Sequence, residues 1–101
     1  MIKLFTLLTL VELIFCFQIT AQTTYYVSEA GNNSNNGLTP QTAFETLQYA
    51  ADQVSAGDYV LVMTGNYTGF DIRTNGTQTL PIVFKAIEDN VVIDERNSVT
   101  P

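Results

Sequence analysis

The sequence predicts an all-β fold, arranged as a parallel β-solenoid, with one amphipathic helix close to its start. Short β-branched and aromatic runs alternate with turns rich in Gly, Asn and Pro. Two apolar runs, at 60–62 and 82–84, lie 22 residues apart, a spacing typical of solenoid repeats. A helical period occurs only at 42–54. The strand pattern by itself also fits an all-β sandwich.

Residues 1–21 predict a secretory signal peptide. Lys3 supplies the positive charge, an apolar run follows, and Ala21 is a small residue at the expected cleavage site. Glu12 near the centre of the apolar run makes the alternative, a membrane anchor, costly. We therefore expect a secreted or cell-surface protein, periplasmic or extracellular, with no membrane contact after cleavage.

The composition excludes several classes of function. Cys16, the only cysteine, lies in the predicted signal peptide, so the mature chain has no disulfide framework and no thiolate ligand. The absence of histidine removes the usual zinc ligand and the commonest general base. A net charge of −6 excludes nucleic acid and anionic lipid as partners held by charge, and an anionic polysaccharide needs a bridging cation.

The helix is predicted over residues 42–54. Thr42 and Glu45 match the S/T-x-x-E capping box that marks the start of a helix. Its apolar face carries Phe44, Leu47, Ala51 and Val54. Gly57 can adopt the left-handed backbone that ends a helix, and Asp58 is expected to fix the turn that follows.

Strands are predicted on both sides of the helix. They cover 23–28, 58–63, 70–73, 81–87 and 91–94. Turns are predicted at 64–69, at the Asn-Gly pair in the loop after residue 73, and at 88–90. The side chains expected to face the core are those of Val60, Val62, Phe70, Ile72, Ile82, Phe84, Val91 and Ile93.

The stretch GNNSNNGLTP, residues 31–40, has three interpretations. Asn32, Ser34 and Asn36, followed by Gly37, match the start of a calcium-binding loop, but Ala43 stands where the closing Glu is needed. Three asparagines begin glycan acceptor sequences: Asn32, Asn66 and Asn75. The favoured interpretation is a turn, because Asn and Gly both tolerate left-handed backbone geometry.

Six pieces of sequence follow one another in a distinctive order: YYVS, GNNSNNG, TPQTAFETLQYAA, AGDYVLV, GNYTG and LPIVFKA. In this order they resemble the N-terminal end of the pectin-lyase-like group of right-handed parallel β-helix proteins, over residues 25–93. The resemblance implies that the helix caps one open end of the β-helix. It also implies that residues 22–101 form this N-terminal cap and the first two coils of a truncated domain.

The same resemblance implies carbohydrate-active relatives, many of them polysaccharide lyases that use a Lys or Arg base and often calcium. No catalytic, cofactor-binding or metal-binding residue is predicted in this chain, and calcium is expected only in a full-length parent. Lys85, Arg73 and Asp71 are expected on solvent-facing strand positions. Asp94 and Glu95 are expected to begin a turn.

Two hypotheses about function follow. The chain is either the N-terminal fragment of a secreted enzyme, a polysaccharide lyase or glycoside hydrolase, that lacks the catalytic site, or part of a non-catalytic adhesin or glycan-binding scaffold. Polysaccharide is the expected partner in both. Two coils leave one end uncovered, so self-association through an open C-terminal edge is also expected.

Overall fold

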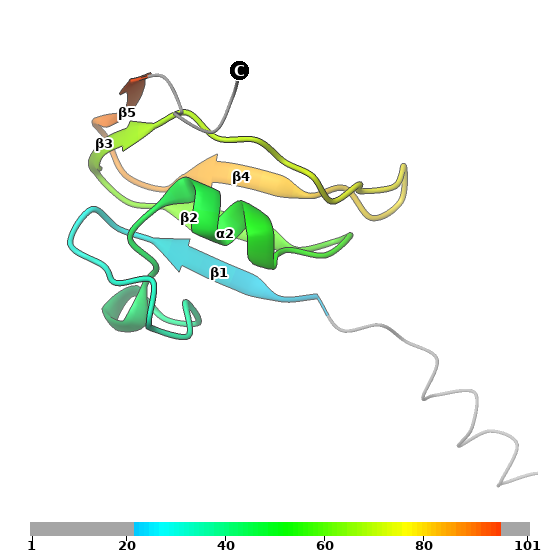
Figure 1. Ribbon diagram of the computed structural model, residues 1–101. Helices are drawn as coiled ribbons and strands as arrows, with labels where there is room; N and C mark the ends of the chain where they lie inside the picture. Colours follow the sequence, from blue (N-terminus) through cyan, green and yellow to red (C-terminus); the bar gives the residue numbers. More distant parts are fainter. Residues whose placement is uncertain (1–21, 96–101) are drawn as a thin grey trace, which may run out of the picture.

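The computed structural model describes residues 22–95. It contains β1 (Thr24–Val27), the 3₁₀ helix η1 (Pro40–Thr42), α2 (Leu47–Gln53), β2 (Tyr59–Val62), β3 (Gly65–Thr68), β4 (Val83–Ala86) and β5 (Val91–Glu95) (Figure 1). The predicted signal peptide, residues 1–21, lies outside the described residues. Within them, no helix combines the length and the apolar character needed to cross a membrane.

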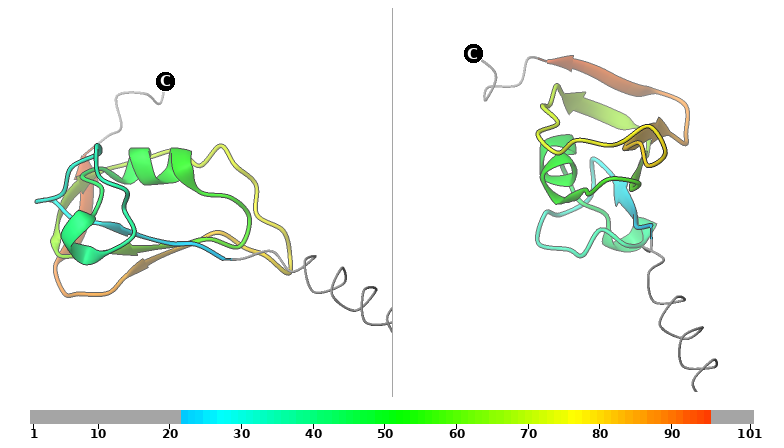
Figure 2. Two further views of the ribbon diagram at one scale, coloured as in Figure 1. Left: turned by 90° about the horizontal axis from the view of Figure 1, so that it is seen from below. Right: turned by 90° about the vertical axis from the view of Figure 1, so that its right-hand side faces the viewer.

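The strands form two small parallel sheets. In the first, β2 lies between β1 and β4, and Val60 is in register with Tyr25 on one side and Phe84 on the other. In the second, β3 pairs with β5, and Gly65 is in register with Val91. Helix α2 lies on one side of the three-stranded sheet (Figure 2). The strand pair β4–β5 is therefore stacked on the strand pair β2–β3.

The predicted fold class, an all-β right-handed parallel β-helix, is wrong for this structure. Residues 22–95 form a small α/β domain with two small parallel sheets and one α-helix, and they show no solenoid. The all-β sandwich is wrong as well, because the strand pairs are parallel and a helix contributes buried residues to the core.

The segment 70–73, predicted as a strand, is not one. At Asp71 the backbone bonds to the helix instead of to a strand: its N–H donates to Gln48 Oε1 over 3.0 Å, and its carbonyl accepts from Gln48 Nε2 over 3.1 Å. The predicted turn at 64–69 contains strand β3 instead, with alternating burial along Gly65–Thr68. The Asn and Gly residues of this segment suggested a turn, but pairing with β5 decides its conformation.

The helix begins five residues later than predicted. Thr46, not Thr42, is the N-cap of α2, and its side chain accepts from the N–H of Tyr49. Thr42 instead closes a capping box with Thr39 around η1. Between the two helices the chain is extended, because Phe44 forms a parallel β-bridge with Val27.

The turn after the helix is formed as expected. Gly57 has a positive φ of 91°, which an L side chain rarely adopts. The buried carboxylate of Asp58 accepts from the N–H of Ser55 over 2.8 Å and from the N–H of Thr23 over 3.0 Å. It therefore fixes the turn and also ties it to the residue before β1.

The core lies between the two sheets and α2. Its buried cluster consists of Val27, Phe44, Leu47, Ala50, Val54, Val60, Val62 and Tyr67. Of the side chains predicted to face inward, Val60 and Val62 are buried, and a further four are partly buried against this cluster: Phe70, Ile82, Phe84 and Val91. The prediction is wrong for Ile72 and Ile93, which are 48% and 52% exposed.

Phe44 occupies the centre of the N-terminal half of the core. Its ring stacks with Tyr25, centroid to centroid 5.6 Å, and meets the edge of Tyr49 at 4.8 Å. Gly37, with φ of 73°, lies so close that a Cβ there would stand 2.5 Å from the Phe44 ring. Only glycine satisfies both the backbone geometry and this close approach.

We expect Phe44→Ala to lower the free energy of unfolding by about 3–5 kcal/mol, because it leaves a cavity among buried side chains. Denaturant titration followed by far-UV circular dichroism measures this change. Leu38→Ala is the matched control, because Leu38 is 50% exposed in the same part of the chain and its truncation should change stability by less than about 0.5 kcal/mol. Equal effects of the two substitutions would contradict the central position of Phe44.

Candidate functional site

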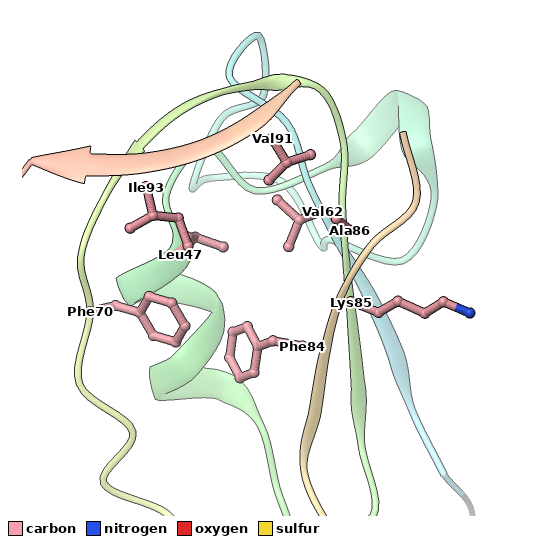
Figure 3. A pocket seen from close by; sticks show the side chains of 8 residues that line it. All are labelled: Leu47, Val62, Phe70, Phe84, Lys85, Ala86, Val91 and Ile93. Atoms are coloured by element: carbon pink, nitrogen blue, oxygen red, sulfur yellow. The ribbon is translucent and has the colours of Figure 1, made fainter. Parts of the chain in front are cut away.

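An apolar groove opens at the end of the domain formed by β4 and β5. It has a volume of about 230 Å³ and is lined by Leu47, Val62, Phe70, Phe84, Lys85, Ala86, Val91 and Ile93 (Figure 3). Phe70 and Phe84 meet across it with ring centroids 4.7 Å apart. The Lys85 side chain points away from the other lining side chains in Figure 3. The groove therefore offers apolar contact and no charged group to a ligand.

The asparagine loop at 31–40 uses its amides to hold the chain. Asn33 Oδ1 accepts from the N–H groups of Glu45 and Thr46 over 2.8 and 3.2 Å, and Asn33 Nδ2 donates to Thr46 Oγ1 over 3.1 Å. Asn35 Nδ2 donates to the carbonyl of Ala43 over 3.0 Å. These bonds hold 43–46 extended in front of α2, which is why the predicted helix start fails.

The other two asparagines form turns within the loop. Asn32 Oδ1 accepts from the N–H of Ser34, and Asn36 Oδ1 accepts from the N–H of Leu38 and from Thr42 Oγ1. The turn interpretation of the stretch therefore describes the structure. The loop fits a calcium site poorly, because the side-chain oxygens of Asn32 and Asn36 accept these bonds and residues 31–40 contain no carboxylate.

A polar groove lies between β3 and the residues that flank the asparagine loop, Glu29 before it and Glu45 and Thr46 after it. It is lined by Glu29, Glu45, Thr46, Asn66, Tyr67 and Thr68. Glu29 accepts from the backbone N–H of Asn66 over 3.1 Å, so one of its oxygens positions β3. The Tyr67 hydroxyl donates to the carbonyl of Met63 over 2.7 Å. This groove does not follow from the sequence pattern, because 64–69 reads as a turn; the alternation along Gly65–Thr68 is the signal that points to a strand there.

A third surface is the outer face of the three-stranded sheet. Two cross-strand rows point away from the core there: Tyr26, Leu61 and Lys85 in one, and Thr24, Tyr59 and Val83 in the other. Tyr26 and Tyr59 are diagonal neighbours on adjacent strands and both are half-buried. In Figure 2 the helix covers the opposite face of this sheet. The outer face therefore presents two tyrosine rings beside one lysine.

Of the charged residues expected on solvent-facing strands, the structure brings Arg73 and Asp71 together and places Lys85 on another strand. Arg73 and Asp71 form an exposed ion pair at 3.9 Å on the segment after β3. Lys85 lies on β4, and Asp94 is an exposed residue of β5, which extends through Glu95 instead of turning there. Among residues 22–95, no three His, Cys, Asp or Glu side chains lie close enough to share a metal ion. The titratable side chains that do line a common groove in the described part of the chain are Glu29, Glu45 and Tyr67, in the polar groove.

We expect Asn33→Ala to lower the free energy of unfolding by about 1–3 kcal/mol, because two backbone N–H groups lose their acceptor. Thermal or denaturant unfolding measures the loss. Asn75→Ala, in the exposed loop before β4, is the control and should change stability by less than about 0.5 kcal/mol. If Asn33→Ala were as stable as this control, the loop would not hold the chain as described.

Tyr67 makes stability depend on alkaline pH. Burial, as the largest cause, raises the pKa of Tyr67 above 10.0; a backbone hydrogen bond with Glu29 opposes this, and the negative charges of Glu29 and Glu88 add to it. The unfolded chain loses this proton near pH 10, whereas the folded chain keeps it. We therefore expect the free energy of unfolding to fall as pH rises above about 10.

Urea titrations between about pH 9 and 12 measure this fall. The decrease should be shallower in Tyr67→Phe, which has no proton to lose, than in the wild type. Leu38→Ala, which removes an exposed side chain and no titrating group, serves as the control and should keep the wild-type slope. An unchanged slope in Tyr67→Phe would contradict the role assigned to Tyr67.

Comparison with known proteins places the chain near carbohydrate-active proteins. No protein-family model matches it. The uncharacterized protein YwoF of Bacillus subtilis (strain 168) is 39% identical over 70 residues, which are 67% of this chain and 15% of YwoF. The chain thus spans only a small part of the length of this relative.

Two solved structures superpose on the chain. XylC, in its complex with xylose, does so with a TM-score of 0.63 and 29% identity, over 68% of this chain and 11% of XylC. The GH136 lacto-N-biosidase of Eubacterium ramulus does so with a TM-score of 0.54 and 26% identity, over 67% of this chain and 12% of the enzyme. Both are carbohydrate-active proteins. They support the expected relation to carbohydrate-active proteins in general, and they do not bear on the finer resemblance to the pectin-lyase-like group.

Proposed function

We propose that this chain is the N-terminal part of a larger, secreted carbohydrate-active protein, and that this part is not itself catalytic. The observation that carries the proposal is the superposition on two carbohydrate-active proteins, at 29% and 26% identity, over about two thirds of the chain. In each case the matched region is 11% or 12% of the other protein. Residues of this chain therefore correspond to one structural unit within much longer carbohydrate-active proteins.

The chemistry of the described residues supports binding rather than turnover. Cleavage of a glycosidic bond needs two carboxyl groups flanking it, and elimination from a uronate needs a base beside a neutralised carboxylate. Arg73 is paired with Asp71 on the surface, and Lys85 lies on a different strand. These three groups do not face a common cavity. Glu29 and Glu45 do line one groove, but one Glu29 oxygen is held by the backbone N–H of Asn66 and the groove has no Lys or Arg among its lining residues.

A direct test incubates the full chain with pectate, chondroitin and xylan. We expect no unsaturated uronate product, measured by ultraviolet absorbance, and no new reducing ends. Lys85→Ala and Asp71→Asn should give the same baseline as the wild type. Turnover of any of these polymers above that of a mock preparation would contradict the proposal, and its loss in Lys85→Ala or Asp71→Asn would locate the activity at that residue.

Glycan binding is the second candidate function, and the outer face of the three-stranded sheet favours it. Tyr26 and Tyr59 present amphipathic rings on a regular strand surface, where a sugar ring can pack on the apolar face of each. The net charge of −6 disfavours an anionic polymer. A neutral glycan is therefore the expected ligand of this face.

We expect the full chain to bind neutral xylo-oligosaccharides more tightly than polygalacturonate, measured by isothermal titration calorimetry. Tyr26→Ala and Tyr59→Ala should each weaken binding about tenfold, because each removes one ring. Leu38→Ala, an exposed apolar truncation away from this face, should bind as the wild type does. Equal affinity of all three variants would exclude the outer face as the binding surface.

A further inference from the structure

The chain contains two Asn-Gly pairs, Asn36-Gly37 and Asn75-Gly76, and both asparagines are exposed. Glycine has no Cβ, so the backbone nitrogen that follows each asparagine is not shielded by a side chain. Such a nitrogen can attack the side-chain amide carbon of the preceding asparagine and close a five-membered ring. The two pairs share this chemistry, so a difference between them in the folded chain must come from the structure.

At the first pair, the groups that would react are held by hydrogen bonds. The attacking group, the Gly37 N–H, donates to the carbonyl of Thr42 over 2.8 Å. The Asn36 amide is held as well, because its Oδ1 accepts from the N–H of Leu38 over 2.9 Å and from Thr42 Oγ1 over 2.8 Å. Gly37 is also buried against the Phe44 ring. Ring closure at Asn36 therefore needs this part of the loop to open first.

The second pair lacks such restraints within residues 22–95. No hydrogen bond joins the Asn75 side chain or the Gly76 N–H to another group in this part of the chain. The loop is held just after the pair, where Thr77 N–H donates to the Leu80 carbonyl over 3.0 Å and Leu80 N–H donates to Thr77 Oγ1 over 2.9 Å. Asn75 and Gly76 are both exposed, so water reaches the amide.

We propose that Asn75 is a site of spontaneous deamidation and that the fold protects Asn36 from the same reaction. The Gly76 nitrogen gives up its proton and bonds to Cγ of Asn75, and the amide nitrogen leaves with that proton as ammonia. The product of this step is a succinimide ring. One water molecule then opens either of two ring bonds, which gives aspartate or isoaspartate at position 75. Water is the only co-reactant, and no group is oxidised or reduced.

The modification changes the loop that leads into β4. A neutral amide becomes a carboxylate in the wall of an open groove that Asn75 lines together with Pro81 and Ile82. Isoaspartate also adds one carbon to the backbone between residues 75 and 76. Gly76 packs closely on the returning chain, where a Cβ would stand 2.8 Å from the backbone nitrogen of Ile82. The longer backbone therefore requires a shift in the residues that enter β4.

Peptide mapping of the full chain during incubation at mildly alkaline pH tests the proposal. Trypsin releases peptide 74–85, in which Asn75 is the single asparagine, and cleavage after glutamate releases peptide 30–45, which contains Asn36. Mass spectrometry with fragmentation follows each asparagine separately, and isoaspartate content is measured on the same peptides. We expect Asn75 to convert at least about tenfold faster than Asn36, because hydrogen bonds must break before Asn36 can react.

The same chain unfolded in guanidinium chloride is the matched control, because both pairs are then unrestrained and should convert at similar rates. Asn75→Gln should abolish conversion at position 75 on this time scale, since a glutamine must close a larger ring, and should leave the rate at Asn36 unchanged. Equal rates at Asn36 and Asn75 in the folded chain would overturn the proposal. So would a folded Asn75 that converts more than about tenfold more slowly than the unfolded one.

Discussion

The closure of the β1 edge is the constraint on which the rest of the structure depends. A strand edge exposes backbone groups that need partners, and here the chain supplies them itself between Gly37 and Phe44. The closure requires Phe44 to be extended, and Asn33 secures this by accepting from the next two N–H groups. Once extended, Phe44 carries its ring into the core, and α2 can begin only after it, at Leu47.

The later strands build on the same closure. The closure is made locally, by residues that lie between β1 and α2 in the sequence. Each later strand pair lies on the previous one in parallel, β2–β3 first and β4–β5 on top of it. The apolar groove forms where residues of β2, β4 and β5 meet α2, and the outer sheet face carries Tyr26 and Tyr59. The candidate binding surfaces among residues 22–95 are therefore shallow grooves and a sheet face.

Local patterns predicted individual elements better than their assembly. The runs at 23–28, 58–63 and 81–87 each contain a strand, and the run at 91–94 covers all of β5 but its last residue. Gly57 and Asp58 form the expected turn, because short-range chemistry decides it. The fold class failed because the pattern cannot show which segments pair: Asp71 bonds to Gln48 of the helix, so 70–73 adds no third sheet. The helix start failed because Thr42 and Glu45 form a valid local signal that the long-range bonds of Asn33 override. The outer tyrosine face could be predicted from the sequence, because side chains alternate along a strand. The apolar groove could not, because it depends on how two sheets and a helix pack together.

Amide hydrogen exchange, resolved residue by residue, tests the closure of the β1 edge most directly. We expect the amides of Tyr26 and Phe44 to be protected, because both donate to backbone carbonyls across this edge. We expect Asn33→Ala to reduce the protection of both amides, because Asn33 holds the chain after Phe44 extended. Rapid exchange at Tyr26 and Phe44 in the wild type would contradict the closure.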